Sequence, residues 1–401
     1  MAFKGEGEEM TDFINKIICG DVMEVLKDMP NKSVQMCVTS PPYYGLRDYG
    51  TANWVGGNGE CEHINGTLQS NKSTLGGRLP EQTLNDKRTK TGIPYTKICG
   101  KCGAIRQDQQ IGLEETPETY LQRLVEIFRE VKRVLKDDGT LWLNLGDSYA
   151  SQGGPLKYDI NSILGGKPEV QDYQVTRKAP QGYKPKDLLG IPWRVAFALQ
   201  ADGWYLRQDI IWNKPNPMPE SVTDRCTKSH EYIFLLAKSQ KYYFDNETIK
   251  EPFAISTLER TQYGNSEKNK LALGQYAGMT IKNYDKYAKK VQDKIIIGRN
   301  KRSVWTVTTQ PFQEAHFATF PEDLVLPCIL AGSKVGDIIF DPFIGSGTAG
   351  LVALKNNRKF VGIELNPKYV EMANRRLKPF LDQRNVSEWL SREKVGKCPE
   401  N

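Results

Sequence analysis

The sequence has no apolar run long enough to cross a membrane. A membrane-spanning helix needs about 20 consecutive, mostly apolar residues, whereas this chain is 39% hydrophobic and 26% charged, with the two kinds of residue interspersed. The N-terminal stretch MAFKGEGEEMTDF also lacks the apolar segment of a secretory signal. These absences argue against the membrane and secreted classes. We therefore expect a soluble, cytoplasmic protein with no membrane partner.

Strong charge imbalance and internal repeats are also absent. The net charge of +7, from 55 basic and 48 acidic residues, is too mild to identify a nucleic-acid-binding protein by itself. Eight cysteines without a secretory signal favour reduced thiols over a disulfide framework. The length of 401 residues allows one large α/β domain with insertions, or two modest domains.

Expected strands and helices alternate along much of the chain. An apolar strand over residues 34–38 precedes a long helix that Thr116 caps, that has Pro117 in its first turn and that Gly139 ends. A helix over 192–202 lies in the middle of the chain. The last third predicts a strand at 337–340, a helix to about residue 356, a strand at 360–363 and a helix at 366–377. Such alternation predicts a mainly parallel sheet covered on both faces.

The turn DPFIGSGT, residues 341–348, predicts a cofactor site. Gly345 and Gly347 let the backbone approach a ligand closely, and the following helix presents free N–H groups. Glu364 ends the next strand, where a carboxylate can accept hydrogen bonds from both hydroxyls of a ribose. A dinucleotide fold would show GxGxxG instead. Asp341 would repel a pyrophosphate, but it suits the cationic amino-acid end of S-adenosylmethionine.

The segment Thr39-Ser40-Pro41-Pro42-Tyr43 predicts a site for an amine. It directly follows a strand and should therefore project from the carboxyl edge of the sheet. The prolines have no N–H, so their surroundings offer acceptors. Hydrogen bonds from an amine to the Ser40 hydroxyl and the Pro41 carbonyl would direct the nitrogen lone pair toward a methyl donor. Tyr43 offers a ring for base stacking, and a base inside a duplex must flip out to reach this pocket.

These two motifs resemble those of the amino-methyltransferase family, DPFxGSGT for the cofactor and [DNS]PP[YFW] for the target. The resemblance covers about 300 of the 401 residues. It implies an α/β, Rossmann-like, S-adenosylmethionine-dependent methyltransferase fold with a seven-stranded, mostly parallel sheet. Because the target tetrad precedes the cofactor turn, the order is the circularly permuted one called β-class, with loop-rich insertions.

The form TSPPY is similar to that of cytosine-N4 enzymes, whereas adenine-N6 enzymes usually carry aspartate at the serine position. We therefore expect methylation of cytosine N4 in double-stranded DNA, in a prokaryotic or phage-encoded system with a restriction endonuclease as a candidate partner. Adenine-N6 methylation and RNA methylation remain alternatives. A catalytically silent DNA-binding module is a further alternative, against which the presence of both intact motifs argues.

The resemblance also implies which residues hold the cofactor. Glu364 would hold the ribose, Asp21 would lie near the adenine, and the segment HFATFPEDL, with His316, Ala318 and Phe320, would pack beside the methionine moiety. The expected cofactor residues are Asp21, Thr39, His316, Phe320, Pro321, Asp341, Pro342, Phe343, Gly345, Ser346, Gly347, Thr348, Glu364 and Asn366. The expected catalytic residues are Ser40, Pro41, Pro42 and Tyr43.

Two pairs of soft ligands form a candidate structural zinc site: Cys61-x-His63 and Cys99-x-x-Cys102. The glycines that flank Cys102 and Cys99 in CGKCG favour the tight turn of a zinc knuckle. The long spacing between the pairs is unusual, and free thiols in a disordered insertion are the alternative. Four protein ligands would leave no open position, so the role would be structural.

The expected organisation places the target half at 14–48 and 116–245 and the cofactor half at 305–380. Residues 49–115 form an insertion with the candidate zinc knuckle, residues 246–304 a basic candidate target-recognition region, and residues 381–401 a tail. The insertion and the basic region are the candidates for reading DNA sequence, although a basic solvated face would look similar. We expect His230 to lie near the target pocket without a catalytic role. Four tryptophans should belong to the core: Trp193, Trp204, Trp212 and Trp305.

Overall fold

The computed structural model describes residues 10–45, 51, 53–61, 99, 101–150, 179–180, 182–254, 256, 289, 298–310 and 320–395. His63, His316, Ala318 and nearly all of the basic stretch lie outside the described residues. None of the helices in the described part is both long and apolar enough to span a bilayer.

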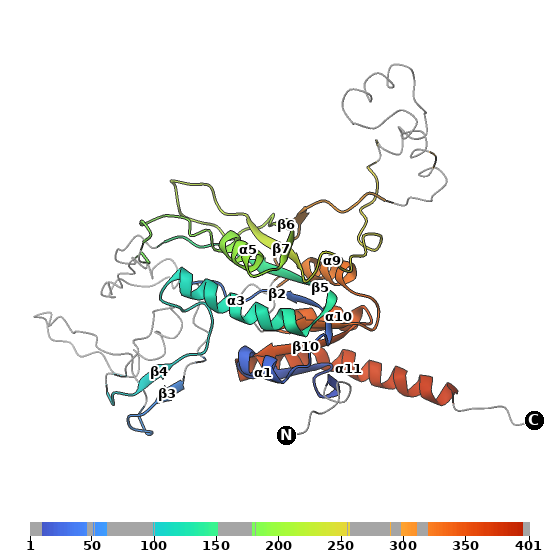
Figure 1. The fold of residues 1–401 in the computed structure, drawn as a ribbon, viewed down its shortest axis with the longest axis horizontal. Coiled ribbons are helices and arrows are strands. Elements are labelled where there is room, and N and C mark those ends of the chain that lie inside the picture. Colours follow the sequence, from blue (N-terminus) through green and yellow to red (C-terminus); the bar gives the residue numbers. More distant parts are fainter. Residues whose placement is uncertain are drawn as a thin grey trace, which may run out of the picture.

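One large sheet runs through the centre of the protein (Figure 1). Every neighbouring pair of its strands is parallel except the two pairs that include β7. The predicted α/β class with a mostly parallel sheet is therefore confirmed. An eighth strand joins the seven expected, because the three-residue β8 pairs with the outer side of β6. The strands in sheet order are β1 (Lys16–Cys19), β10 (Lys359–Glu364), β9 (Ile338–Asp341), β2 (Val34–Thr39), β5 (Leu135–Leu145), β7 (His230–Ala237), β6 (Tyr205–Asn213) and β8 (Val304–Thr306).

Helices cover both faces of this sheet. Successive side chains of a strand point to opposite faces, so β5 contributes Leu141 and Leu143 to one apolar core and Trp142 to the other. The first core contains α1 (Val22–Asp28), α3 (Pro117–Val134) and α5 (Ile191–Ala201). The second contains α9 (Glu322–Gly332), α10 (Thr348–Lys355) and α11 (Pro367–Val395). A short 3-10 helix, η1 (Met10–Asp12), precedes β1.

Helix α3 begins as the sequence predicts and ends earlier. The Thr116 hydroxyl accepts a hydrogen bond from the Thr119 N–H, and Pro117 occupies the first position of the helix. The expected end at Gly139 is wrong, because the helix stops at Val134 and β5 starts at once. The physical reason is strand pairing: residue 135 already pairs with the beginning of β2 across a bulge.

The sheet gathers the site at one edge. The parallel strands β1, β10, β9, β2 and β5 all end at this edge, as does β6, and the antiparallel β7 begins there. Strands β2 and β9 are neighbours although one lies near the start and the other near the end of the chain. The insertion forms a separate two-stranded sheet of β3 (Asn53–Val55) and β4 (Ile105–Gln107) beside the main body (Figure 1).

Candidate active site

The ends of β2 and β9 are joined by a buried hydrogen bond. The Thr39 hydroxyl donates to Asp341 Oδ1 over 2.6 Å, although the two residues are 302 positions apart. The residue after Thr39 is the serine of the target tetrad, and the residues after Asp341 form the glycine turn. The two predicted motifs therefore leave the sheet side by side.

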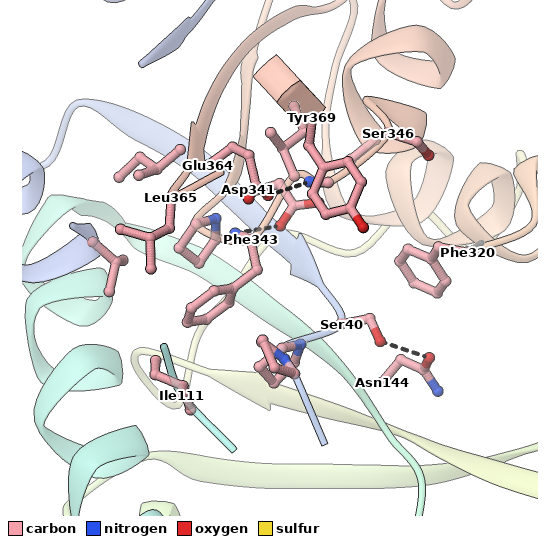
Figure 2. A pocket seen from close by; sticks show the side chains of 18 of the residues that line it. Ser40, Ile111, Asn144, Phe320, Asp341, Phe343, Ser346, Glu364, Leu365 and Tyr369 are labelled. Atoms are coloured by element: carbon pink, nitrogen blue, oxygen red, sulfur yellow. Dashed lines mark hydrogen bonds between the residues drawn. The ribbon is translucent and has the colours of Figure 1, made fainter. Parts of the chain in front are cut away.

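One cavity of about 380 Å³ lies above this junction (Figure 2). Both motifs contribute to its walls, so the structure brings together residues from the first and last thirds of the chain. The predicted site residues that line it are Asp21, Ser40, Pro41, Pro42, Tyr43, Phe320, Asp341, Pro342, Phe343, Gly345, Ser346, Thr348 and Glu364.

The other predicted cofactor residues within the described part stand behind the cavity wall. Thr39 binds Asp341, and Pro321 is the residue before the first turn of α9. The Asn366 N–H donates to Glu364 Oε1 over 2.8 Å. These residues support the lining, whereas His316 lies outside the described residues.

Asp341 is a buried carboxylate at the end of β9. Its Oδ1 accepts hydrogen bonds from the Thr39 hydroxyl and from the Phe343 N–H at 3.0 Å. Its Oδ2 has no hydrogen-bond partner among the described residues. The pKa of Asp341 is raised to about 7, mainly by burial and in smaller part by the negative charge of Glu364, while the hydrogen bonds from Thr39 and Phe343 act in the opposite direction.

Glu364 supplies a second buried carboxylate on the neighbouring strand. Its Oε2 accepts a hydrogen bond from the Gly345 N–H over 3.0 Å, which ties the glycine turn to the end of β10. Burial raises the pKa of Glu364, while backbone N–H groups of Asn366 and Gly345 lower it. Two carboxylates buried at one cavity wall favour a ligand that carries positive charge.

The glycine turn is held from behind as well as from the cavity. Gly347 has a φ of +85°, and a Cβ there would lie 3.1 Å from the Cβ of Ala373 in α11. The absence of a side chain at Gly347 therefore allows the positive φ and the close packing of α11, and Gly347 itself does not line the cavity. Arg376 of α11 donates to the Ser346 carbonyl over 3.2 Å and to the Thr348 hydroxyl over 3.0 Å. This arginine, which the motif did not reveal, fixes the start of α10.

Asp21 has a structural contact in addition to its place in the cavity wall. Its Oδ1 accepts hydrogen bonds from the N–H groups of Met23 at 2.9 Å and Glu24 at 3.3 Å, so it caps α1. The carboxylate thus lies at the edge of the cavity where β1 ends, and one of its oxygens is already used by the helix cap.

A polar network surrounds Ser40 at the cavity wall. The Ser40 hydroxyl donates to Asn144 Oδ1 over 3.2 Å and lies 3.4 Å from the Tyr43 hydroxyl. Because the serine proton is directed at the protein, its lone pairs are available to an incoming N–H group. Tyr43 donates to Glu231 Oε2 over 2.7 Å. Burial raises the pKa of Tyr43 well above its usual value, and the charge of Glu231 adds to this effect, so the hydroxyl stays protonated.

The two proline carbonyls of the tetrad differ in their contacts. The Pro42 carbonyl accepts a hydrogen bond from the Tyr120 hydroxyl over 2.9 Å. The Pro41 carbonyl has no partner among the described residues. A free carbonyl beside the Ser40 hydroxyl gives the pair of acceptors that an exocyclic amine needs.

A family model of N6 and N4 methyltransferases, described as DNA methylase, matches residues 34–375. The chain belongs to this DNA methylase family. It is 42% identical over 362 residues to the type II methyltransferase M.Cfr9I of Citrobacter freundii, covering 89% of this chain and 86% of the relative. It is 39% identical over 362 residues to the type II methyltransferase M.SmaI of Serratia marcescens, covering 90% of each. The solved PvuII DNA methyltransferase (cytosine-N4-specific) aligns with a TM-score of 0.45 at 15% identity, covering 89% of this chain and 84% of that one.

The cavity of this DNA methylase also contains residues that the motifs did not reveal. Asn144, Lys214 and Glu231 line it together with the tetrad. Trp212 is buried as expected, and it also lines the cavity. The ring of His230, the residue before Glu231, packs against the ring of Tyr232 with 5.3 Å between the ring centroids. Lys214 and Glu231 follow the end of β6 and the start of β7, so only the pairing of these strands brings them to the site. Of the other tryptophans, Trp204 and Trp305 are buried and Trp193 is half-buried.

Three of the four candidate zinc ligands of the methylase meet beside the small β3–β4 sheet. The Sγ atoms of Cys61, Cys99 and Cys102 lie within 4.8 Å of one another, with 3.9 Å between the first two. The Cys99 N–H donates to the Ala104 carbonyl over 2.7 Å, which closes a tight turn around Cys102. Backbone N–H groups of Asn58 and Ala104 lower the pKa of Cys102, whereas desolvation raises the pKa of Cys61 to about 11.

Proposed function

We propose that this DNA methylase transfers a methyl group from S-adenosylmethionine to the N4 amine of a cytosine flipped out of duplex DNA. The observation that carries the proposal is the shared cavity, in which the Ser40–Pro41 acceptors and the Asp341–Glu364 carboxylates face the same space. Displacement in line requires the amine and the methyl donor to lie within reach of each other. A single cavity at the junction of β2 and β9 supports that requirement.

The cofactor half has the chemistry that S-adenosylmethionine needs. When bound, this cofactor supplies a methyl group activated by a positively charged sulfur. Asp341 offers its second oxygen to a cationic group, and Glu364 can accept hydrogen bonds from ribose hydroxyls. The start of α10, fixed by Arg376, closes the cavity wall beside Ser346 and Thr348.

The target half positions the amine rather than deprotonating it. The Ser40 hydroxyl and the Pro41 carbonyl accept its two N–H groups, which turns the nitrogen lone pair away from the base ring. A serine hydroxyl is too weak a base to remove a proton before transfer, so the proton leaves after the methyl group has arrived. Tyr43 keeps its hydroxyl on Glu231 and presents its ring to the cavity.

Cytosine N4 is preferred over adenine N6 because the tetrad carries serine where adenine enzymes usually carry aspartate. Duplex DNA is the substrate that follows from membership of the DNA methylase family. The relatives M.Cfr9I and M.SmaI are named as type II methyltransferases. By analogy we place this enzyme in the cytoplasm of a prokaryotic or phage system, where it protects DNA from a cognate restriction endonuclease.

The test is to sequence the modified bases in DNA from cells that express the protein. The wild type should place N4-methylcytosine within one short sequence motif, and that DNA should resist cleavage by the cognate endonuclease. The Ser40→Ala variant should leave the DNA unmodified while binding S-adenosylmethionine with unchanged affinity in calorimetry. Methyl groups found on adenine N6 or on RNA would overturn the cytosine assignment. Absence of any cofactor binding by the wild type would favour a silent DNA-binding module.

The cysteine cluster is proposed as a structural zinc site, with His63 as the fourth ligand. Three thiols within 4.8 Å and a Cys-x-x-Cys turn support it. Mass spectrometry of the purified protein should find one zinc ion per chain, lost in Cys102→Ser and retained in Cys226→Ser, which changes an exposed cysteine far along the chain. Equal metal content in both variants would refute the site.

A further inference from the structure

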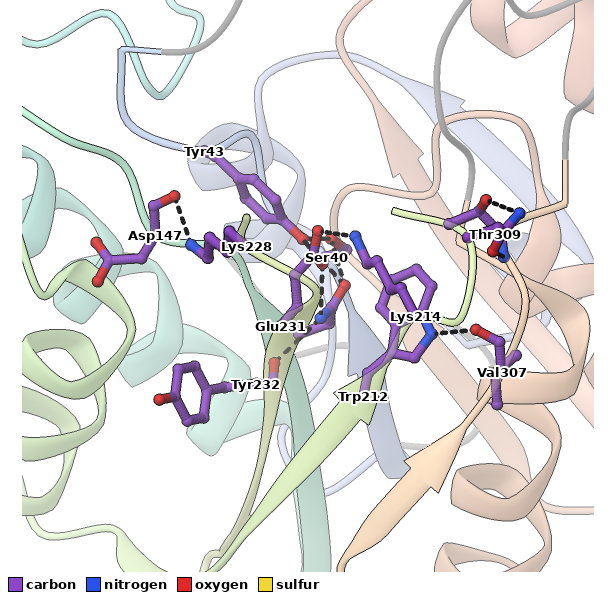
Figure 3. Close-up of polar contacts among 12 residues, drawn as sticks. Ser40, Tyr43, Asp147, Trp212, Lys214, Lys228, Glu231, Tyr232, Val307 and Thr309 are labelled. Atoms are coloured by element: carbon purple, nitrogen blue, oxygen red, sulfur yellow. Dashed lines mark hydrogen bonds and ion pairs between the residues drawn. The ribbon is translucent and has the colours of Figure 1, made fainter. Parts of the chain in front are cut away.

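The target half of the cavity contains a buried ion pair that the proposed chemistry does not use. Lys214 Nζ contacts Glu231 Oε1, and the two side chains are 16% and 14% exposed. Both line the cavity with Ser40 and Asn144, and Figure 3 shows them beside Ser40. Removing two opposite charges from water is costly, and a buried pair often stabilises a fold no better than apolar residues would. A pair placed in the wall of a substrate cavity is therefore expected to act on the substrate.

Glu231 connects this pair to the tetrad. Its Oε2 accepts hydrogen bonds from the Tyr43 hydroxyl at 2.7 Å and from Asn144 Nδ2 at 3.3 Å, while Oε1 binds Lys214. The ammonium also lies 4.2 Å from the ring centroid of Trp212. Glu231 and Trp212 thus hold the ammonium group, and Tyr43 and Asn144 in turn hold Glu231.

The Lys214 ammonium is the donor in this network that has unused N–H groups. An ammonium carries three N–H groups, of which one is used by Glu231, and the Lys214 ammonium has no other hydrogen-bond partner among the described residues, whereas the backbone N–H of Lys214 donates to the Ser229 carbonyl. The neighbouring donors are already engaged. Asn144 Nδ2 binds Glu231 and the Tyr232 carbonyl, and Trp212 Nε1 binds the Val307 carbonyl at 2.8 Å.

Cytosine and adenine differ at the place where such a donor matters. On both bases the exocyclic amine is followed by a ring nitrogen that accepts a hydrogen bond. The next position is the O2 carbonyl in cytosine, whereas in adenine it is a C–H group. An ammonium can donate to O2 but not to C–H, and a buried N–H group left without an acceptor costs binding free energy.

We propose that Lys214, positioned by Glu231, donates a hydrogen bond to O2 of the flipped cytosine and thereby selects cytosine over adenine. The inference rests on the proposed N4 reaction and assigns its base selection to residues outside both motifs. Lys214 is then a base-binding residue and Glu231 a positioning residue. With adenine, one N–H group of the ammonium has no acceptor on the base, whereas the ion pair with Glu231 is the same for both bases.

The experiment compares two duplexes that carry the enzyme's recognition sequence. One has cytosine and the other adenine at the target position, each opposite an abasic site, so that loss of base pairing is the same in both. The single-turnover rate of methyl transfer gives a cytosine-to-adenine ratio for each protein. The variants are Lys214→Met, Lys214→Arg and Glu231→Gln. The matched control is Lys228→Met, because Lys228 is another part-buried lysine, donates to the Asp147 carbonyl at 2.7 Å and does not line the cavity (Figure 3).

The wild type should prefer cytosine, and Lys214→Met should lower the cytosine rate about 10- to 100-fold, the value of a charged hydrogen bond, while the adenine rate stays level or rises. Lys214→Arg should restore much of the ratio, Glu231→Gln should lower it, and Lys228→Met should leave it unchanged. Calorimetric binding of S-adenosylmethionine and a thermal melt check that each variant is folded.

Each contrary outcome has a separate meaning. If Lys214→Met lowers the transfer rates on the cytosine and adenine duplexes equally, so that the cytosine-to-adenine ratio is unchanged, the selection proposal is overturned while the N4 reaction stands. A wild type that methylates only the adenine duplex overturns the N4 reaction and the selection with it. If Lys214→Met does not fold, the ratio for Glu231→Gln decides, because a purely structural pair would not change the preference between two bases.

Discussion

Folding and cofactor binding should favour opposite charge states of Asp341: the neutral carboxyl stabilises the cofactor-free fold, and the ionised carboxylate binds the cationic cofactor. The pKa of this residue is raised from 3.8 to about 7 by burial, and at 1.36 kcal/mol per pKa unit this corresponds to about 4 kcal/mol. The pKa of Asp341 is higher in the folded protein than in the unfolded chain. The stability of the fold associated with the protonated carboxyl is therefore fully present below pH 3.8 and is lost as the pH rises through about 7. Above that pH, the ionised carboxylate destabilises the cofactor-free protein by up to this amount.

The Asp341→Asn variant removes the charge and keeps the shape. An asparagine Oδ1 can still accept from the Thr39 hydroxyl and the Phe343 N–H. We therefore expect the cofactor-free variant to be more stable than the wild type at pH 8, with the gain shrinking as the pH falls toward 4. For the same reason, its affinity for the cationic cofactor should fall about 10- to 100-fold.

Thermal unfolding by fluorescence at a series of pH values, without and with S-adenosylmethionine, measures both effects. Wild-type affinity should also rise with pH up to about 7, because the cation favours the ionised carboxylate, whereas the affinity of the variant should be nearly flat in this range. A cofactor-free variant that melts below the wild type at pH 8, or a stability difference that does not depend on pH, would refute the reasoning.

Three further predictions concern the contacts around the cavity. Thr39→Val removes the bond between β2 and β9 and should lower the free energy of unfolding by about 1–3 kcal/mol in a urea titration; an unchanged midpoint would contradict it. Gly146→Ala would place a Cβ 2.5 Å from Tyr43 Cε2, so transfer should slow by about 100-fold with unchanged cofactor affinity; wild-type single-turnover rates would count against this. Glu364→Ala should raise the dissociation constant of the cofactor about 10- to 100-fold in calorimetry, and equal affinity would remove its assigned role.

The central elements were predictable because their signals are local. Strand β2 directly precedes the target tetrad, and α10 directly follows the glycine turn, so each motif marks the element beside it. The Thr116 cap likewise marks the start of α3. The placement of both motifs at one sheet edge follows from the parallel arrangement alone. The single error in α3 arose because pairing with β2, a contact about 100 positions away, ends the helix before Gly139 does.

Lys214 and Glu231 could not be predicted, because their position depends on the register of the β6–β7 pair. In that register Trp212 faces Glu231, and no short motif encodes this pairing. Arg376 is a similar case, since it reaches the glycine turn from the middle of α11. Site residues that act through side-chain contacts between distant strands and helices can be identified only from the three-dimensional structure. Site residues in the loops that follow parallel strands can be identified from the sequence.

The position of β2 between β5 and β9 affects how the chain is made. The ribosome must add about 300 residues after β2 before β9 exists, which takes roughly 15–60 s at 5–20 residues per second. During that time one long side of a central strand, all of whose residues are buried in the finished fold, has unsatisfied N–H and C=O groups and can pair with other nascent chains. Slow translation or low temperature during synthesis should therefore change the yield of folded enzyme more than the stability of the finished fold suggests.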